Sequence, residues 1–174
     1  LYDREAISLP ASLAHPKKAP EFAVRSWREL EGYRDLAKNG SLTVAQVKEL
    51  RHGYYACVSY IDAQVGKLMK TLEASGLIET TVVCLWGDHG FHLGEQGLWT
   101  KANNYEWSTR VPLLIADPGQ EPGKTEALVE LVDIYPTLVE LCELPIGSQL
   151  EGQSLIPLLR NPHQPWAESA MSQS

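Results

Sequence analysis

The sequence of 174 residues predicts an α/β protein, in which helices cover a sheet. Three observations support this class. Apolar residues recur at spacings of three or four over residues 43–74, which predicts one long helix. The apolar run at 80–86 does not alternate with polar residues, which predicts an inner strand of a parallel sheet. A second apolar run at 111–116 predicts another strand, with Pro112 near its start.

The elements before the first strand are an arm and two helices. Residues 1–26 are rich in proline and are expected to form an irregular arm on the surface. Residues 27–38 carry apolar positions at helical spacing, and Asn39-Gly40 follows them as a stop signal. The long helix has Ser41 or Thr43 as its cap and ends before Gly76.

The elements after the first strand are a long loop, a strand and a helix. Residues 87–110 are expected to form the loop, and Asp117-Pro118-Gly119 turns the chain after the second strand. Residues 128–143 have a helical pattern, with Asp133 as a cap and Pro136 in the first turn. Residues 145–165 contain four prolines and are expected to be mostly loop.

Composition excludes several classes of protein. The chain is 44% hydrophobic and 21% charged, as expected for one globular domain with a sizeable core. Its net charge of −7 gives no support to nucleic-acid binding, which favours a basic face. The sequence contains no run of 18 apolar residues, so no membrane span is expected. The chain begins with Leu and has no visible signal peptide, so its compartment is not readable here.

The three cysteines are widely spaced and form no C-x-x-C pair, which argues against a zinc site or a disulfide framework. Cys84 lies in the first apolar strand and Cys142 in the last predicted helix. We expect the cysteines to be small, buried apolar side chains, in common with most unpaired cysteines.

The most informative motif is Gly87-Asp88-His89-Gly90, directly after the first strand. Open α/β sheets bind ligands at the carboxyl ends of their strands. Asp88 offers the oxygen ligands that Ca²⁺ and Mg²⁺ prefer, and His89 can ligate a metal or carry a proton. An aspartate at this position is also a common turn or cap residue. The two flanking glycines favour the ligand site, because they let the backbone approach a ligand closely.

The loop after this motif contains further candidates. Lys101 can hold an oxyanion as a point charge, although a lone loop lysine is usually a solvated surface residue. His92 and Glu95 either face a pocket or fix the loop by hydrogen bonds, and we favour the structural role. Arg110 contacts a substrate carboxylate or pairs with a surface acid, and we favour the pair. Four aromatic residues can stack on a sugar, although we expect at least two of them to pack the loop: Phe91, Trp99, Tyr105 and Trp107.

These segments together resemble the sulfatase family, and within it the iduronate-2-sulfatase-like branch. The helix Tyr55–Gly66 resembles the one that precedes the metal-site strand, and Gly87–Lys101 resembles the sulfatase loop itself. The resemblance covers roughly residues 50–160 and continues through three more segments: Arg110–Ile115, Val129–Leu138 and Leu150–Leu155.

The resemblance implies a fold, a site and a cofactor. The fold is the three-layer α/β sandwich of the alkaline phosphatase superfamily, a sheet flanked by helices, present here only in part. Asp88 resembles a metal ligand, His89 the neighbouring metal-site residue with a catalytic role, and Lys101 the catalytic lysine that contacts the sulfate ester. The implied cofactor is a divalent cation, usually Ca²⁺, with Mg²⁺ as the alternative. Phe91 and Arg110 are further substrate contacts that the pattern supports less.

The resemblance also implies a substrate, a sulfated carbohydrate such as a 2-sulfated uronic acid, and slightly favours an extracytoplasmic compartment. In this family a formylglycine, made from Cys or Ser in the motif Cys/Ser-x-Pro-x-Arg, attacks sulfur. That motif and the paired aspartate ligands that accompany it do not occur in the 174 residues.

We therefore expect residues 1–165 to be the later part of a sulfatase catalytic domain and residues 166–174 to begin a following segment. The nucleophile would lie in an N-terminal part of the same protein, and the isolated chain is predicted to be inactive. Two alternatives stay open: a phosphoesterase or phosphonate hydrolase of the same superfamily, and a non-catalytic domain that binds anions or a partner.

Overall fold

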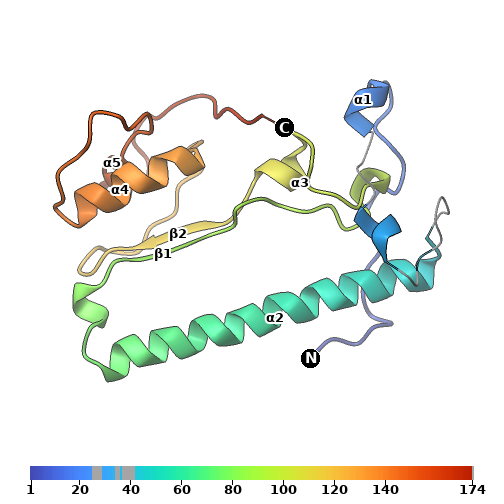
Figure 1. The fold of residues 1–174 in the computed structure, drawn as a ribbon, viewed down its shortest axis with the longest axis horizontal. Coiled ribbons are helices and arrows are strands. Elements are labelled where there is room, and N and C mark those ends of the chain that lie inside the picture. Colours follow the sequence, from blue (N-terminus) through green and yellow to red (C-terminus); the bar gives the residue numbers. More distant parts are fainter. Residues whose placement is uncertain (25–28, 34–35, 37–41, 174) are drawn as a thin grey trace. The chain divides into compact units, whose positions relative to one another are not determined.

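The computed structural model describes residues 1–24, 29–33, 36 and 42–173 (Figure 1). One long helix and a pair of short strands are its main regular elements. In chain order the elements are α1 (Glu21–Val24), the 3₁₀ turn η1 (Glu29–Gly32), α2 (Val44–Ala74), η2 (Ile78–Thr80), β1 (Val83–Trp86), η3 (Glu95–Gly97), α3 (Glu106–Thr109), β2 (Leu113–Ala116), η4 (Leu131–Asp133), α4 (Ile134–Leu141) and α5 (Ile156–Arg160).

The chain divides into two compact units. The first comprises Leu1–Thr71 and His89–Val111, and therefore holds most of α2 and the glycine-rich loop. The second comprises Leu72–Asp88 and Pro112–Gln173, with both strands, α4 and α5. The predicted division at residue 165 stays a prediction. Much of the helix predicted over 27–38 lies outside the described residues.

The long helix predicted over 43–74 is confirmed as α2, which spans 31 residues without a break (Figure 1). Its start is fixed by a reciprocal pair of hydrogen bonds. The Gln46 backbone N–H donates to Thr43 Oγ1 at 3.2 Å, and the Thr43 N–H donates to Gln46 Oε1 at 2.9 Å. This capping box satisfies two backbone donors that a helix start leaves unpaired. Gly76 adopts a φ of 67° just after the helix, the left-handed conformation that glycine accepts most easily.

The apolar stripe of α2 is buried mainly near its N-terminal end, where Val47 is only 4% exposed. The segment before α1, residues 1–20, contains no helix or strand, and its start contacts this end of α2. Lys48 Nζ donates to the Glu5 carbonyl oxygen at 2.7 Å and to Glu5 Oε2 at 3.1 Å. Farther along the helix, four members of the stripe are exposed: Tyr54, Val58, Ile61 and Leu68.

In the second unit, β1 and β2 form a two-stranded antiparallel sheet in which Val83 pairs with Ala116 and Trp86 with Leu113. Both predicted strands are confirmed. The prediction that β1 is a parallel strand covered on both faces is wrong for the described residues, in which β1 pairs antiparallel with β2. An apolar run reports burial but carries no information on strand direction. Here the chain reverses between the two runs, and Leu85 and Trp86 are exposed.

The cysteine prediction is wrong for Cys57 and Cys142, because both are exposed. Cys84 is half-buried, and burial raises the pKa of its thiol. Among the described residues, no helix combines the length and the apolar character that crossing a membrane requires.

The core of the second unit joins η4, α4 and α5 through two polar side chains. Asp133 lies just before α4 as predicted, but its carboxylate points away from that helix: Oδ2 accepts from the Glu130 N–H at 2.9 Å and Oδ1 from the Gln153 N–H at 2.8 Å. Thr137 is fully buried, donates to the Asp133 carbonyl oxygen at 2.6 Å and accepts from the Leu155 N–H at 2.8 Å.

Helix α5 was not predicted from the sequence, which indicated mostly loop over 145–165. The helix has only five residues and carries a proline in its first turn. Proline is compatible with that position because the backbone N–H there needs no helical partner. Ile156 and Leu158 are buried, and α5 contacts α4. Packing of a short apolar segment therefore creates this helix.

Thr137 provides a test of this core. Thr137→Val keeps the shape of the side chain but leaves the buried Leu155 N–H without its acceptor. We expect the free energy of unfolding to fall by about 1–3 kcal/mol in urea denaturation. The matched control is Thr71→Val on the exposed face of α2, which we expect to stay within about 0.5 kcal/mol of wild type. Equal effects of the two variants would contradict the role assigned to Thr137.

Candidate active site

Asp88 lies two residues beyond β1, as the sequence predicts. The ladder continues past the strand, because the Gly87 N–H donates to the Pro112 carbonyl oxygen at 3.0 Å. Asp88 follows this last bond, and its side chain is exposed. The backbone is thus held by β2 up to the residue before the carboxylate, which makes the position of Asp88 in the second unit well defined.

His89 begins the loop in the first unit and is also exposed. Its Nδ1 contacts the Gly90 carbonyl oxygen at 2.8 Å. When Nδ1 donates to this carbonyl, the neutral ring carries its lone pair on Nε2, which is the arrangement found in metal-binding histidines. This contact orients the imidazole from within its own loop.

Gly90 is needed for packing within the loop. Its N–H donates to the Ser108 carbonyl oxygen at 2.8 Å, and an added Cβ would overlap the carbonyl oxygen of Trp107. The sequence favoured a close approach of the backbone to a ligand at this glycine. The close approach that the structure contains is instead to the loop's own residues around α3.

The segment from His92 to Thr100 doubles back on itself. The His92 N–H donates to the Thr100 carbonyl oxygen and the Gly94 N–H to that of Leu98, both at 2.9 Å. Two glycines make the reversal possible with positive φ values, 98° at Gly94 and 73° at Gly97. These backbone bonds hold together the two limbs of the loop, one leading from His89 and the other leading to Lys101.

The structural roles favoured for His92 and Glu95 are confirmed. His92 is fully buried, with Nδ1 3.2 Å from the Glu95 carbonyl oxygen and Nε2 3.3 Å from Asn103 Oδ1. The same Asn103 oxygen accepts the Tyr105 N–H at 2.9 Å. The side chains of His92 and Asn103 therefore fix the loop from inside.

A buried ion pair that holds the loop was not predicted from the sequence. Arg51 of α2 is 8% exposed and forms an ion pair with Glu95, with Nη1 2.9 Å from Oε1. Burial by itself lowers the pKa of Arg51, but hydrogen bonds to Glu95 and Tyr55 outweigh it, so that this pKa is raised and the guanidinium stays charged. The available signal was a charged residue within the buried, N-terminal part of an apolar stripe.

Lys101 follows the buried Thr100 and is exposed, and its carbonyl oxygen accepts the Asn103 N–H at 2.9 Å. The loop therefore fixes the backbone of Lys101. Arg110 pairs with Glu106 one turn away on α3, with Nη1 3.2 Å from Oε1, and both side chains are exposed. This is the surface pair that the sequence favoured for Arg110.

The aromatic residues divide between packing and exposure. Phe91 stacks on Tyr54 of α2, with ring centroids 6.2 Å apart, and Tyr105 meets the edge of His92 at 6.0 Å. Trp107 is exposed. The expectation that at least two of the loop's four aromatics pack it is therefore confirmed.

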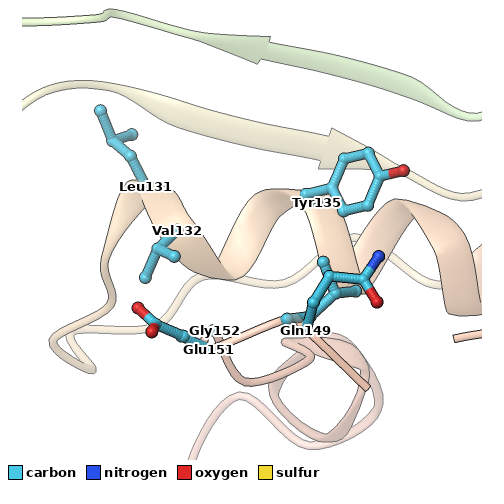
Figure 2. A pocket seen from close by; sticks show the side chains of 7 residues that line it. Leu131, Val132, Tyr135, Gln149, Glu151 and Gly152 are labelled. Atoms are coloured by element: carbon cyan, nitrogen blue, oxygen red, sulfur yellow. The ribbon is translucent and has the colours of Figure 1, made fainter. Parts of the chain in front are cut away.

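A hollow of about 280 Å³ lies in the second unit, and none of the predicted site residues lines it. Figure 2 shows Leu131, Val132 and Tyr135 projecting from η4 and the start of α4, beside the segment Gln149–Gly152. Its lining is mainly apolar and has no cluster of titratable groups.

Solved structures of other proteins place this fold in a class of α/β hydrolases. A phosphonate monoester hydrolase from Silicibacter pomeroyi matches 94% of this chain and 34% of its own, with a TM-score of 0.78 and 25% identity. A protein solved with its substrate D-glucosamine-2-N,6-O-disulfate matches 75% of this chain and 28% of its own, with a TM-score of 0.67 and 29% identity. The fold is therefore that of the alkaline phosphatase-like sulfatases and phosphonate hydrolases, present in part.

Sequence comparison gives the family. The model of the sulfatase family matches residues 12–144, and the chain belongs to that family. Choline-sulfatase of Rhizobium meliloti is 38% identical over 70% of this chain and 24% of that protein. Human iduronate 2-sulfatase is 32% identical over 84% of this chain and 32% of that protein. The chain thus spans about a quarter to a third of the length of these relatives.

Gly90 provides a test of the loop's packing. Gly90→Ala forces a methyl group against the Trp107 carbonyl, and we expect it to lower the free energy of unfolding by about 1–3 kcal/mol. Gly53→Ala is the matched control, because Gly53 lies in α2 with nothing near its Cβ position, and we expect it to raise stability by about 0.5–1 kcal/mol. Urea denaturation measures both, and a neutral Gly90→Ala variant would show that the contact is not rigid.

Proposed function

We propose that this chain is the later part of the catalytic domain of a metal-dependent sulfuric ester hydrolase, with residues 1–165 in that domain and 166–174 in a following segment. One observation carries the proposal. A carboxylate, an imidazole and an ammonium group, from Asp88, His89 and Lys101, occur in one short stretch within the region matched by the sulfatase family. Each has the chemistry that transfer of a sulfate group needs.

In this proposal Asp88 is an oxygen ligand of a divalent cation, Ca²⁺ in the first instance and Mg²⁺ as the alternative. A divalent cation, when bound, withdraws negative charge from the oxygens of the sulfate ester. His89 lies beside Asp88 in the chain and offers Nε2 to the metal site or to a proton in transfer. Lys101 places its ammonium group against the sulfate oxygens and neutralises the charge that develops on them.

In this proposal Asp88 and His89 would supply only part of the metal site. Nowhere among them do three or more His, Cys, Asp or Glu side chains gather to hold an ion. Ca²⁺ takes about six to eight oxygen ligands, so the proposal requires further ligands from outside these residues. The nucleophile is required as well, because the formylglycine motif does not occur in the sequence. We expect the isolated chain to have no sulfatase turnover for this reason.

The proposed substrate is a sulfated carbohydrate such as a 2-sulfated uronic acid. The name of the relative iduronate 2-sulfatase supports this class of substrate. Phe91 would offer a ring face to the sugar, and Arg110 would exchange Glu106 for the uronate carboxylate. An extracytoplasmic compartment stays part of the same proposal.

A second candidate is hydrolysis of a phosphonate or phosphate ester, favoured by the match to a phosphonate monoester hydrolase over 94% of this chain. The two reactions are separated by assaying the full-length protein that contains this chain with an aryl sulfate and an aryl phosphonate monoester side by side. Faster turnover of the sulfate supports the proposal, and faster turnover of the phosphonate replaces it.

A non-catalytic, anion- or partner-binding domain is the third possibility. It would be indicated if the full-length protein turned over neither ester and Ca²⁺ with sulfate left its melting temperature unchanged.

Lys101 tests the proposed stabilisation of charge. We expect Lys101→Ala in the full-length protein to lower kcat for an aryl sulfate by about 10²–10³-fold, because one positive group would be lost from the developing oxyanion. Lys124→Ala is the matched control, since Lys124 is an exposed lysine of the second unit paired with Glu126, and its kcat should equal that of wild type. An unchanged rate for Lys101→Ala would remove Lys101 from the site.

Asp88 tests the proposed metal site independently of turnover. We expect Asp88→Asn to weaken Ca²⁺ binding by at least about 10- to 100-fold. Losing a residue that only hydrogen-bonds to a metal ligand already has an effect of this size, and Asp88 is proposed to be a ligand itself. Calorimetric titration of the full-length protein with Ca²⁺ measures the affinity. Asp62→Asn, an exposed carboxylate on α2, is the control and should bind as wild type does. Equal affinities for both variants would show that Asp88 is not a ligand.

A further inference from the structure

The side chain of Arg51, on α2, is hydrogen-bonded to the loop that carries His89 and Lys101. Arg51 Nη1 donates to two acceptors of the loop, the Leu93 carbonyl oxygen at 3.0 Å and Glu95 Oε1 at 2.9 Å. Its other terminal nitrogen, Nη2, donates to the Tyr55 hydroxyl at 3.1 Å. The guanidinium is thus bonded both to the loop and to its own helix, which fixes the loop against α2.

Glu95 completes the grip from the side of the loop. Its second oxygen, Oε2, accepts the Leu93 N–H at 2.6 Å. Both backbone polar groups of Leu93 are therefore bonded to this one ion pair. The side chains of Arg51 and Glu95 are 10% and 15% exposed, so the pair is shielded from water. Charge-assisted hydrogen bonds in such surroundings are shorter and stronger than neutral ones.

The Arg51–Glu95 pair is connected through the loop backbone to the candidate catalytic residues His89 and Lys101. Glu95 lies six residues after His89 and six before Lys101. The two limbs of the loop are tied by the bonds His92 to Thr100 and Gly94 to Leu98. A displacement of Leu93 is therefore transmitted along one limb toward His89 and across the bonds to the limb that ends at Lys101.

We propose that Arg51 and Glu95 are positioning residues for the reaction, acting through the backbone of Leu93 to set where Lys101 presents its ammonium group. This inference rests on the proposed sulfatase function. It differs from a purely stabilising ion pair in one respect. A positioning pair affects the rate of the chemical step through Lys101, whereas a stabilising pair affects only how much protein is folded.

The variants must keep the buried charges balanced, because removing one partner leaves the other unpaired. Arg51→Lys keeps the positive charge, but one ammonium nitrogen cannot replace both Nη1, which bonds Leu93 and Glu95, and Nη2, which bonds Tyr55. Lys48→Gln is the matched control. Lys48 lies on the same helix three residues earlier, and its ion pair is with Glu5 of the arm.

The experiment measures kcat and KM for an aryl sulfate in the full-length protein, together with melting temperature. We expect Arg51→Lys to lower kcat about 10- to 100-fold, the size of effect that a displacement of about 1 Å produces, with KM within about twofold. Lys48→Gln should leave both constants unchanged. A wild-type kcat in Arg51→Lys, or a loss of rate that only follows the loss of folded protein, overturns the inference.

A double-mutant cycle separates positioning from stability. If Arg51 acts through Lys101, Arg51→Lys should cost little further rate in the Lys101→Ala background. Multiplication of the two losses would show independent effects and overturn the inference.

Failure of the proposed function is distinguishable from failure of the inference. A wild-type protein with no sulfatase turnover refutes the function, and hydrogen exchange then decides whether Arg51 holds the loop. Faster exchange of the amides over 92–101 in Arg51→Lys, with 56–71 of α2 unchanged, supports the grip. Unchanged exchange over 92–101 refutes it.

Discussion

The ion pair between Arg51 and Glu95 is the interaction on which the candidate site depends. A glycine-rich loop has no ladder of its own to satisfy its backbone groups, yet those groups must be bonded once they are buried. Here a helix side chain and a loop side chain together bond both polar groups of Leu93. The backbone hydrogen bonds of α2 are satisfied within the helix, so α2 is a firm support. Through Arg51 it restrains the glycine-rich loop, which would otherwise sample many conformations.

The glycines of the loop serve this arrangement. Gly94 and Gly97 supply the positive φ angles that reverse the chain, and Gly90 lets α3 approach the start of the loop. His89 and Lys101, near the ends of the loop, are therefore held by buried neighbours, His92 and Thr100 among them, although their own side chains reach the surface. Such a division, with a fixed backbone and exposed reactive groups, is what precise placement of a reactive group requires.

Much of the fold was readable from the sequence, and the parts that were not share a physical cause. Helix α2, its Thr43 cap, both strands and the turn at Asp117–Gly119 follow from local periodicity and turn chemistry. The antiparallel pairing of β1 with β2 and the existence of α5 depend on contacts between distant segments, which periodicity does not encode. For the site, the strand-end position of Asp88 was predictable, whereas the partner of Glu95 was not, because Arg51 lies 44 residues away in the chain.

The exposed apolar side chains have a practical consequence for handling this chain. Val58, Ile61 and Leu68 on α2, and Leu85 and Trp86 on β1, present apolar surface to water. A two-stranded sheet is marginal in water, and unpaired strand edges template pairing with other chains. Produced as a separate polypeptide, these 174 residues would tend to self-associate, and their solubility would improve with whatever polypeptide covers these faces. Solution behaviour, measured by light scattering over a concentration series, therefore becomes the first criterion for choosing expression boundaries.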